Sequence, residues 1–165
     1  MADVMVVILM GVSGCGKTTI GGRLAEDLGW RFLDADDFHP PRNIQLMAAG
    51  QPLTEEDRRP WLAELHREIA QAIASGRSAT LACSALSRES RQQLMVGDPA
   101  VRLVYLKGSM ELIRHRLRNR SGHFMREGLL ASQFAALEEP TDAFVVDIDD
   151  RPGAIVEKIR KGLHI

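Results

Sequence analysis

The sequence predicts an α/β fold with a five-stranded parallel sheet and helices on both of its faces. Three observations support this prediction. Apolar runs of strand length alternate along the chain with helix-length amphipathic patterns. The first run, residues 4–10, is apolar throughout, as expected of a strand buried on both faces. A glycine-rich turn then joins this run directly to a helical pattern.

The strands are expected at residues 4–10, 31–33, 79–83, 101–106 and 143–148. The helices are expected at residues 17–28, 43–49, 55–75, 87–96, 110–119, 129–137 and 152–163, and residues 121–128 look irregular. Several boundaries carry local signals: Gly29 follows a helical pattern, Ser109 precedes one, and Pro152 stands in a first turn. Thr54, with Asp57 three residues later, forms a weak capping box at the start of the third helix.

Length and composition limit the classes of function. The 165 residues predict one domain, which we take as residues 1–165. A formal net charge of -1 gives no overall basic field, so we expect neither nucleic acid nor a membrane surface as a partner. The apolar run at residues 4–10 is too short to span a bilayer. Cys15 and Cys83 have no metal-ligand or disulfide-framework spacing, which favours a reducing, cytoplasmic location.

The turn after the first strand carries a phosphate-binding motif. The stretch GVSGCGKT, from Gly11 to Thr18, fits G-x-x-x-x-G-K-[ST] between a strand and a helix. The motif predicts that ATP is bound by the loop and by the start of the following helix. Lys17 is expected to reach the β- and γ-phosphates, and the Thr18 hydroxyl to ligate Mg²⁺. The expected nucleotide-binding residues are Gly11, Val12, Ser13, Gly14, Cys15, Gly16, Lys17, Thr18 and Thr19. The alternative interpretation is a glycine-rich turn in which the lysine is incidental.

Cys15 within this loop has two interpretations. The simpler one is a small residue that fits the turn. The other is a thiol made acidic by the start of the helix, and therefore sensitive to oxidation.

Two carboxylates follow the second strand. Asp34 and Asp36 are expected on one side of an extended segment at the carboxyl end of the sheet, where ligands bind in such folds. Phosphoryl transfer needs one carboxylate near the metal and one that accepts the proton of the attacking hydroxyl. We assign Asp34 to the first role and Asp36 to the second. A solvated acidic turn is the alternative, and Asp37 fits that description.

A run of arginines follows the fourth strand at Arg114, Arg116, Arg118 and Arg120. Such a run is usually a solvated basic face. In an otherwise acidic chain it also suits a mobile lid, at about residues 116–130, that brings arginine onto ATP. Because residues four apart share a helix face, Arg116 and Arg120 are expected on one stripe and Arg114 and Arg118 on another.

Five stretches of the sequence together resemble the gluconokinase family of small P-loop kinases. They are GVSGCGKTT, DADDFHPPRNIQLMAAGQPLTEEDRRPWL, CSALSRESR, VYLKGSMELIRHRLRNRSGHF and SQFAALEEP, in this order over nearly the whole chain. The resemblance implies a fold like that of nucleoside-monophosphate kinases, with a mobile lid. It implies transfer of phosphate from ATP to the 6-hydroxyl of D-gluconate, giving 6-phospho-D-gluconate. Family members are typically cytoplasmic and often homodimeric.

The resemblance also implies which residues lie near the acceptor. They are Asp36, His39, Asn43, Arg58, Trp61, Ser84 and Arg91, with an acceptor-binding helical segment at about residues 38–75. Either Arg58 or Arg91 suits the carboxylate of gluconate, because a guanidinium can hold a carboxylate through two hydrogen bonds. Asn43, Ser84 and His39 suit its hydroxyls. His39 is equally compatible with a turn histidine bound to backbone, and Trp61 with helix core.

For the lid, the resemblance places Arg120 near the transferring phosphoryl group and Arg116 near adenine. The sequence departs from the family pattern at Ser87-Arg88, where two basic residues are common, so that one basic side chain and its phosphate contact are missing while the reaction is unaffected. Two other functions remain open. One is a P-loop kinase for another small acceptor, such as shikimate or a nucleotide. The other is a regulatory module that binds a nucleotide without transferring phosphate.

Overall fold

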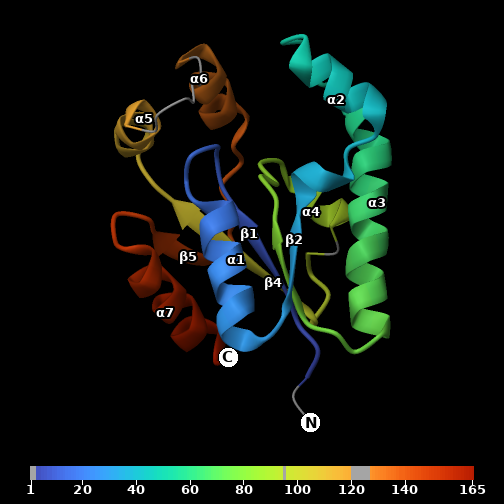
Figure 1. Ribbon diagram of the computed structural model, residues 1–165, viewed down its shortest axis with the longest axis vertical. Coiled ribbons are helices and arrows are strands. Elements are labelled where there is room, and N and C mark those ends of the chain that lie inside the picture. The colour runs from blue at the N-terminus through green and yellow to red at the C-terminus, as the bar shows by residue number, and fades with distance from the viewer. Residues whose placement is uncertain (1–2, 95, 120–126) are drawn as a thin grey trace.

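A five-stranded sheet lies between two layers of helices in the computed structural model, which describes residues 3–94, 96–119 and 127–165 (Figure 1). The strands are β1 (Val6–Met10), β2 (Arg31–Asp34), β3 (Ala79–Ala82), β4 (Val101–Lys107) and β5 (Phe144–Asp147). They run parallel in the order β2-β3-β1-β4-β5. This arrangement confirms the predicted fold class.

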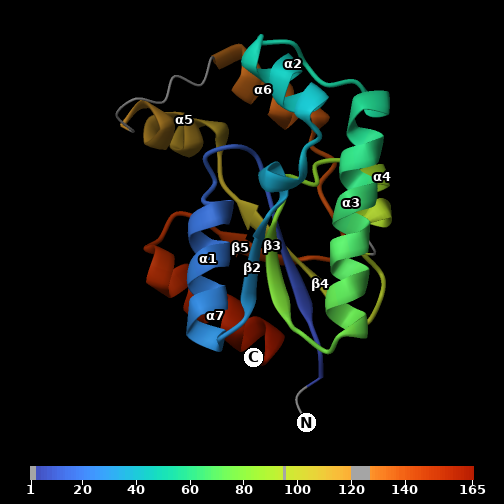
Figure 2. The same cartoon turned by 45° about the vertical axis from the view of Figure 1, so that its right-hand side comes forward.

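The strand register brings the carboxyl ends of the central strands together at one edge of the sheet. Met10 pairs with Tyr105 of β4, and Asp34 pairs with Ala82 of β3. The segments that follow β1, β2 and β3 therefore begin side by side. Above this edge stand α2 (Pro41–Ala48), α5 (Met110–Arg118) and α6 (Glu127–Ala136), as the two views in Figures 1 and 2 show.

Each face of the sheet has its own hydrophobic core. On one face, α3 (Glu55–Ala74) buries Leu65 and Ile69 against Val6 and Ile8, and α4 (Arg88–Gln93) covers the same side. On the other face, α1 (Lys17–Leu28) and α7 (Pro152–Leu163) bury their apolar stripes against the alternate side chains of β1 and β4. This double coverage explains why β1 is buried at every position.

The helix boundaries follow local chemistry. The Thr54 hydroxyl accepts the Asp57 backbone N–H, and the Asp57 carboxylate accepts that of Thr54, so the capping box predicted for α3 is present. Ser109 caps α5 through the N–H of Leu112. Gly29 ends α1 with φ 67°, a conformation that glycine adopts without strain. α2 begins two residues earlier than expected, at Pro41, and α4 ends three residues earlier, at Gln93.

The segment after β2 differs from the prediction. Residues Ala35–Phe38 form a 3₁₀ helix, η1, rather than an extended continuation of the strand. The cause is Asp34, whose Oδ1 accepts the backbone N–H of Asp36 at 3.0 Å and turns the chain immediately after the strand. Asp34 and Asp36 therefore do not share one side of an extended segment. None of the helices in the described part of the chain combines the length and apolar character needed to cross a bilayer.

Candidate active site

The loop between β1 and α1 has a tight curl that requires glycine at two positions. Gly11 has φ +152°, and a Cβ there would lie 2.6 Å from Cys15 Sγ and 2.9 Å from the Leu106 carbonyl oxygen. Gly14 has φ +84°, and a Cβ there would lie 2.9 Å from the side chain of Leu117 in α5. Any larger residue would therefore push the loop away from the sheet or from α5.

The start of α1 is suited to an anion. Gly16 precedes the helix with φ +98° and supplies no side-chain cap, and the first turn holds no acidic residue. The first N–H groups of α1 therefore have no capping side chain, and the positive end of the helix dipole adds to their attraction for phosphate.

Lys17 folds back over the loop that precedes it. Its ammonium donates to the Gly11 carbonyl at 3.0 Å and to the Val12 carbonyl at 3.1 Å, and lies 3.9 Å from Cys15 Sγ. The charge is thus held at the centre of the curl, where the motif places the β- and γ-phosphates. Thr19 follows on the exposed side of α1.

The Cys15 thiol is buried, with 1% of the residue exposed. Burial raises its pKa, and the nearby Lys17 ammonium offsets only part of this effect. A thiol of this kind is protonated at neutral pH and is a poor nucleophile. The structure therefore favours the simpler interpretation of Cys15 as a small residue that fits the loop.

Thr18, in the first turn of α1, meets Asp34 at the end of β2. The Thr18 hydroxyl donates to Asp34 Oδ2 at 3.1 Å, while Oδ1 of the same carboxylate holds the turn into η1. A hydroxyl and a carboxylate are oxygen ligands of the type that Mg²⁺ prefers. Within the described ranges no cluster of three or more His, Cys, Asp or Glu side chains could hold a metal alone. Phosphate oxygens and water would complete the coordination shell.

Asp36 lies in η1, two residues beyond Asp34. The residue is exposed, yet surrounding protein atoms remove part of the hydration of its carboxyl. This desolvation, followed by repulsion from Asp34, raises the pKa of Asp36, and His39 and Lys17 oppose the shift. A carboxylate with a raised pKa is a stronger base than an ordinary aspartate.

His39 and Trp61 form a stacked pair beside η1. Their ring centroids are 4.3 Å apart, with an angle of 13° between the planes. The Trp61 indole N–H donates to the Ala35 carbonyl at 2.7 Å, which fixes the ring against η1. Desolvation lowers the pKa of His39, against the opposing effect of Asp36, so its imidazole is neutral at physiological pH. Trp61 is half-buried: it packs against the α3 core and also presents a face to His39.

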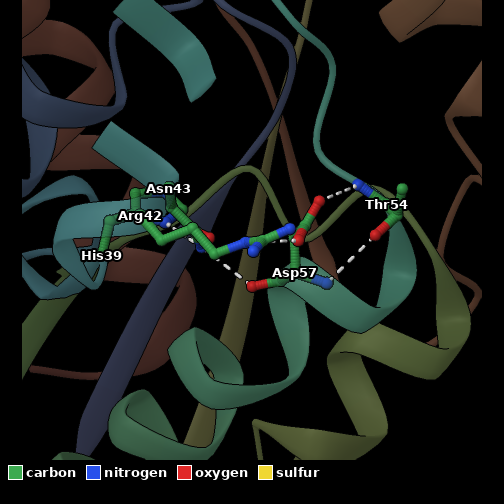
Figure 3. Close-up of polar contacts among 5 residues, drawn as sticks. All are labelled: His39, Arg42, Asn43, Thr54 and Asp57. Atoms are coloured by element: carbon green, nitrogen blue, oxygen red, sulfur yellow. Dashed lines mark hydrogen bonds and ion pairs between the residues drawn. The ribbon is translucent and has the colours of Figure 1, made fainter. Parts of the chain in front are cut away.

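Asn43 connects this pair to the start of α3 (Figure 3). It is 1% exposed, and its side-chain amide nitrogen lies 3.2 Å from His39 Nδ1 and 2.9 Å from the Asp57 carbonyl oxygen. Since an amide nitrogen only donates, Nδ1 of His39 accepts and Nε2 carries the proton. Arg42 adds an ion pair with the Asp57 carboxylate at 3.5 Å. The first turns of α2 and α3 are thereby joined.

The two arginines expected near the acceptor have different environments. Arg58 is exposed and donates to the Leu53 carbonyl at 2.9 Å. Arg91 is 5% exposed, and its guanidinium donates to the carbonyls of Ala85, Leu86 and Glu138 at 2.8–3.0 Å. Arg91 thus fastens the segment after β3 to the segment after α6, whereas the Arg58 guanidinium, bonded to the Leu53 carbonyl, lies on the exposed surface.

Ser84 follows β3 and links that strand to the phosphate loop. Its carbonyl accepts the Gly11 backbone N–H at 3.3 Å, and the residue is half-buried. Ala85, next along the chain, has φ 45°, an uncommon angle for a residue with a side chain. The Arg91 bond to the Ala85 carbonyl helps to hold this conformation.

A cavity of about 300 Å³ opens beside the phosphate loop, between α5 and the start of α7. Its walls include Cys15, Thr19, Arg116, Leu117 and Asp150. The Arg116 guanidinium donates to the Ile148 carbonyl at 2.5 Å, so it is held against the end of β5. Arg120 and the rest of residues 120–126, the middle of the expected lid, lie outside the described residues, and the role of Arg120 stays a prediction.

One contact of the site was not predicted. Gln133 of α6 bonds to Ser13 inside the phosphate loop, 120 residues earlier in the chain. A glutamine carries neither charge nor a motif position, so no signal in the sequence marks it. The sequence offers only that Gln133 lies in SQFAALEEP, one of the five stretches that carry the family resemblance.

Comparisons with known proteins agree with this geometry. A family model described as an AAA domain matches residues 6–140. A gluconokinase of Gluconobacter oxydans is 42% identical, with 93% of this chain and 88% of that protein covered. The thermoresistant gluconokinase of Escherichia coli is 40% identical, with 97% and 96% covered.

This chain belongs to the gluconokinase family. The crystal structure of a gluconokinase from Sinorhizobium meliloti superimposes on it with a TM-score of 0.86 at 36% identity, covering 99% of this chain and 94% of that one. An alignment of this extent spans the chain from the phosphate loop to α6.

Proposed function

We propose that this protein transfers the γ-phosphoryl group of ATP to the 6-hydroxyl of D-gluconate, giving ADP and 6-phospho-D-gluconate. The observation that carries the proposal is the contact between Thr18 and Asp34, beside Asp36, at the edge of the sheet where the phosphate loop begins. Membership of the gluconokinase family supplies the acceptor.

The phosphate loop would bind the nucleotide. Its backbone N–H groups and the start of α1 suit the β-phosphate, and Lys17 neutralises charge on the β- and γ-oxygens. The cavity lined by Arg116 and Leu117 has the place and size for the adenine ring, next to Thr19. Thr18 and Asp34 would hold Mg²⁺, which draws charge from the phosphate oxygens when bound.

Asp36 would act as the general base. The 6-hydroxyl oxygen of gluconate attacks the γ-phosphorus, the bond from that phosphorus to the β–γ bridging oxygen breaks, and ADP leaves. The hydroxyl proton passes to the Asp36 carboxylate. The raised pKa of Asp36 makes this transfer more favourable than it would be for an ordinary aspartate.

The stacked pair of His39 and Trp61 would form one wall for the sugar acid. His39 presents an Nε2–H donor because Asn43 occupies its other nitrogen. Ser84 lies at the neighbouring strand end and offers a hydroxyl. For the gluconate carboxylate we favour Arg58 over Arg91, because the Arg91 guanidinium already serves three backbone carbonyls and Arg58 serves one.

The lid completes the proposal. Residues 116–130 would close over the nucleotide, with Arg120 reaching the transferring phosphoryl group. The segment at residues 38–75, which contains α2 and α3, would bind the acceptor. We also place the protein in the cytoplasm, in accord with two cysteines that are free and buried. A homodimer, expected from the resemblance, stays a prediction.

The test is a coupled assay of ADP release with Mg·ATP and a panel of acceptors: gluconate, shikimate, glycerate and nucleoside monophosphates. We expect turnover that requires both gluconate and Mg²⁺. Stimulation by another acceptor and not by gluconate would contradict the substrate assignment. ATP binding without turnover on any acceptor would instead favour a nucleotide-binding regulatory module.

A further inference from the structure

Arg91 is buried, and its guanidinium is directed at the backbone of two segments. Its Nη1 donates to the carbonyls of Ala85 at 2.8 Å and Leu86 at 3.0 Å, and its Nη2 donates to the carbonyl of Glu138 at 2.8 Å. The Glu138 N–H in turn donates to the Leu86 carbonyl at 2.8 Å. Because the donors of a guanidinium are fixed in one plane, these bonds hold the three carbonyls in a defined arrangement.

Ala85 is held in a backbone conformation that alanine disfavours. Its φ of 45° lies in the left-handed region, where Cβ crowds the following carbonyl oxygen. The residue is 4% exposed, and both its own carbonyl and that of Leu86 accept from Arg91. The Arg91 bonds therefore offset the cost of this φ, and without them Ala85 would relax toward a negative value.

The φ of Ala85 also sets the direction of the Ser84 carbonyl. This angle is the rotation about the Ala85 N–Cα bond, and the peptide unit that precedes the bond carries the Ser84 carbonyl. The same carbonyl accepts the backbone N–H of Gly11, the first residue of the phosphate loop, at 3.3 Å. Relaxation of Ala85 would thus turn the Ser84 carbonyl away from Gly11.

Gly11 has little room to shift without moving the rest of the loop. A Cβ added there would lie 2.6 Å from Cys15 Sγ and 2.9 Å from the Leu106 carbonyl oxygen. The Gly11 carbonyl also accepts from the Lys17 ammonium at 3.0 Å. A displacement of Gly11 would therefore change the position of the charge on which the motif depends.

We propose that Arg91 is a positioning residue for the phosphate loop. It stabilises the left-handed conformation of Ala85, which keeps the Ser84 carbonyl on the Gly11 N–H and so keeps the loop in its shape for the nucleotide. Arg91 thereby acts on the nucleotide side of the site, although the family resemblance groups it with the acceptor residues. The inference rests on the proposed binding of ATP by this loop and not on the identity of the acceptor.

The first measurement is binding of Mg·AMP-PNP by calorimetry, without acceptor and well below the Tm of every variant. Arg91→Met keeps a long side chain in the buried position but has no donor, and Arg91→Lys keeps the charge but not the planar guanidinium. Arg77→Met, at an exposed position before β3, is the matched control. We expect roughly tenfold weaker binding by Arg91→Met, because the cost of the left-handed φ is no longer offset. Arg91→Lys should lose less, and Arg77→Met should bind as the wild type does.

Ala85→Gly tests whether Arg91 acts through Ala85. Glycine adopts a positive φ without the steric cost of Cβ, so the segment should keep its conformation without help from Arg91. When Arg91→Met is made in the Ala85→Gly background, it should therefore weaken binding by roughly twofold or less. Arg91→Lys provides the same comparison if Arg91→Met does not fold. An equal loss in both backgrounds would overturn the proposal.

A second readout is the amide hydrogen exchange of Gly11, followed by NMR. It should be faster in Arg91→Met than in the wild type, and unchanged in Arg77→Met. A higher KM for gluconate with unchanged binding of Mg·AMP-PNP would make Arg91 an acceptor ligand and contradict the proposal. A lower Tm with unchanged binding and unchanged Gly11 exchange would contradict it too, since Arg91 would then stabilise the fold alone. A wild type that binds no nucleotide would overturn the proposed function together with this inference, whereas failure of gluconate as acceptor would affect the proposed function alone.

Discussion

Lys17 connects the end of the phosphate loop to its beginning, because its ammonium donates to the carbonyls of Gly11 and Val12. Replacing it with alanine removes the positive charge that would meet the γ-phosphate. We expect Lys17→Ala to lower kcat by roughly 10²-fold or more, because charge that builds in the transition state loses its partner. The check is steady-state kinetics together with a thermal melt. Lys161→Ala, an exposed change on α7, is the control. A folded Lys17→Ala protein with nearly normal kcat would refute the assigned role.

Asp36 gives a prediction in which activity and stability change in opposite directions. Its pKa is raised in the folded protein, so at neutral pH its charge destabilises the fold relative to the unfolded chain. Asp36→Asn should therefore lower kcat sharply with little change in ATP binding, while the melting temperature stays equal or rises. A residue needed only for structure would lower the melting temperature instead.

The pH dependence of Asp36 tests the same role. Because the carboxyl must be ionised to accept a proton, wild-type kcat/KM should rise as the pH increases through its raised pKa. This acid limb should be absent from the residual activity of Asp36→Asn. Asp37→Asn, a change one residue later in η1, is expected to match the wild type. Greater sensitivity of Asp37 would show that the catalytic carboxylate is the next one along the chain.

At the scale of secondary-structure elements, the arginines of α5 have different environments. Arg116 lines the cavity beside the phosphate loop, Arg114 lies against Met110 on the same helix, and Arg118 is exposed. We expect Arg116→Ala mainly to raise the KM for ATP. Arg114→Ala and Arg118→Ala should stay within a few-fold of the wild type, and Arg120→Ala should cost on the order of 10²-fold in kcat. Steady-state kinetics of the four variants provides the measurement. Equal, small losses throughout would indicate a solvated basic face.

Asn43 is one of the two residues of α2 whose side chains bond to the first turn of α3. Asn43→Ala would remove the side-chain donor to the half-buried Asp57 carbonyl and release His39 from its fixed tautomer. We expect a loss of about 1–3 kcal/mol in the free energy of unfolding. The KM for gluconate should rise more than that for ATP, since His39 lies on the acceptor side. Urea titration and kinetics measure both effects, with Gln45→Ala on the exposed side of α2 as control. An equal rise in both KM values would argue against a role in positioning the acceptor.

Elements with a strong local pattern were predictable, and contacts across the fold were not. The first strand and the helices at Lys17–Leu28 and Pro152–Leu163 follow from apolar periodicity and from boundary residues. η1 was missed because one hydrogen bond, donated by the Asp36 backbone N–H to the Asp34 carboxylate, overrides the extended pattern. The motif located Lys17 and Thr18, but the contacts of Arg91 with Glu138 and of Gln133 with Ser13 join remote segments that only the tertiary structure brings together.

At the scale of the whole molecule, the candidate site draws on three neighbouring strands of the sheet. The phosphate loop follows β1, Asp34 ends β2, Ser84 follows β3, and Arg91 ties the β3 side to the end of α6. The two hydrophobic cores lie on opposite faces of the sheet, and the sheet edge that carries the site lies between them. A ligand that contacts the ends of several strands should therefore stabilise the whole fold rather than one segment of it.

This expectation leads to a thermal test. A ligand at 100 times its Kd stabilises the folded state by about 2.7 kcal/mol, and for a chain of this length each kcal/mol shifts Tm by roughly 2–4 °C. We expect saturating Mg·ADP to raise Tm by roughly 5–10 °C, and gluconate added with Mg·ADP to raise it further. Shikimate, a sugar-acid-like carboxylate of another shape, should add nothing to the Mg·ADP shift. Scanning calorimetry at matched concentrations measures all of these shifts. A shift with shikimate and none with gluconate would show that the pocket beside His39 and Trp61 is built for a different acceptor.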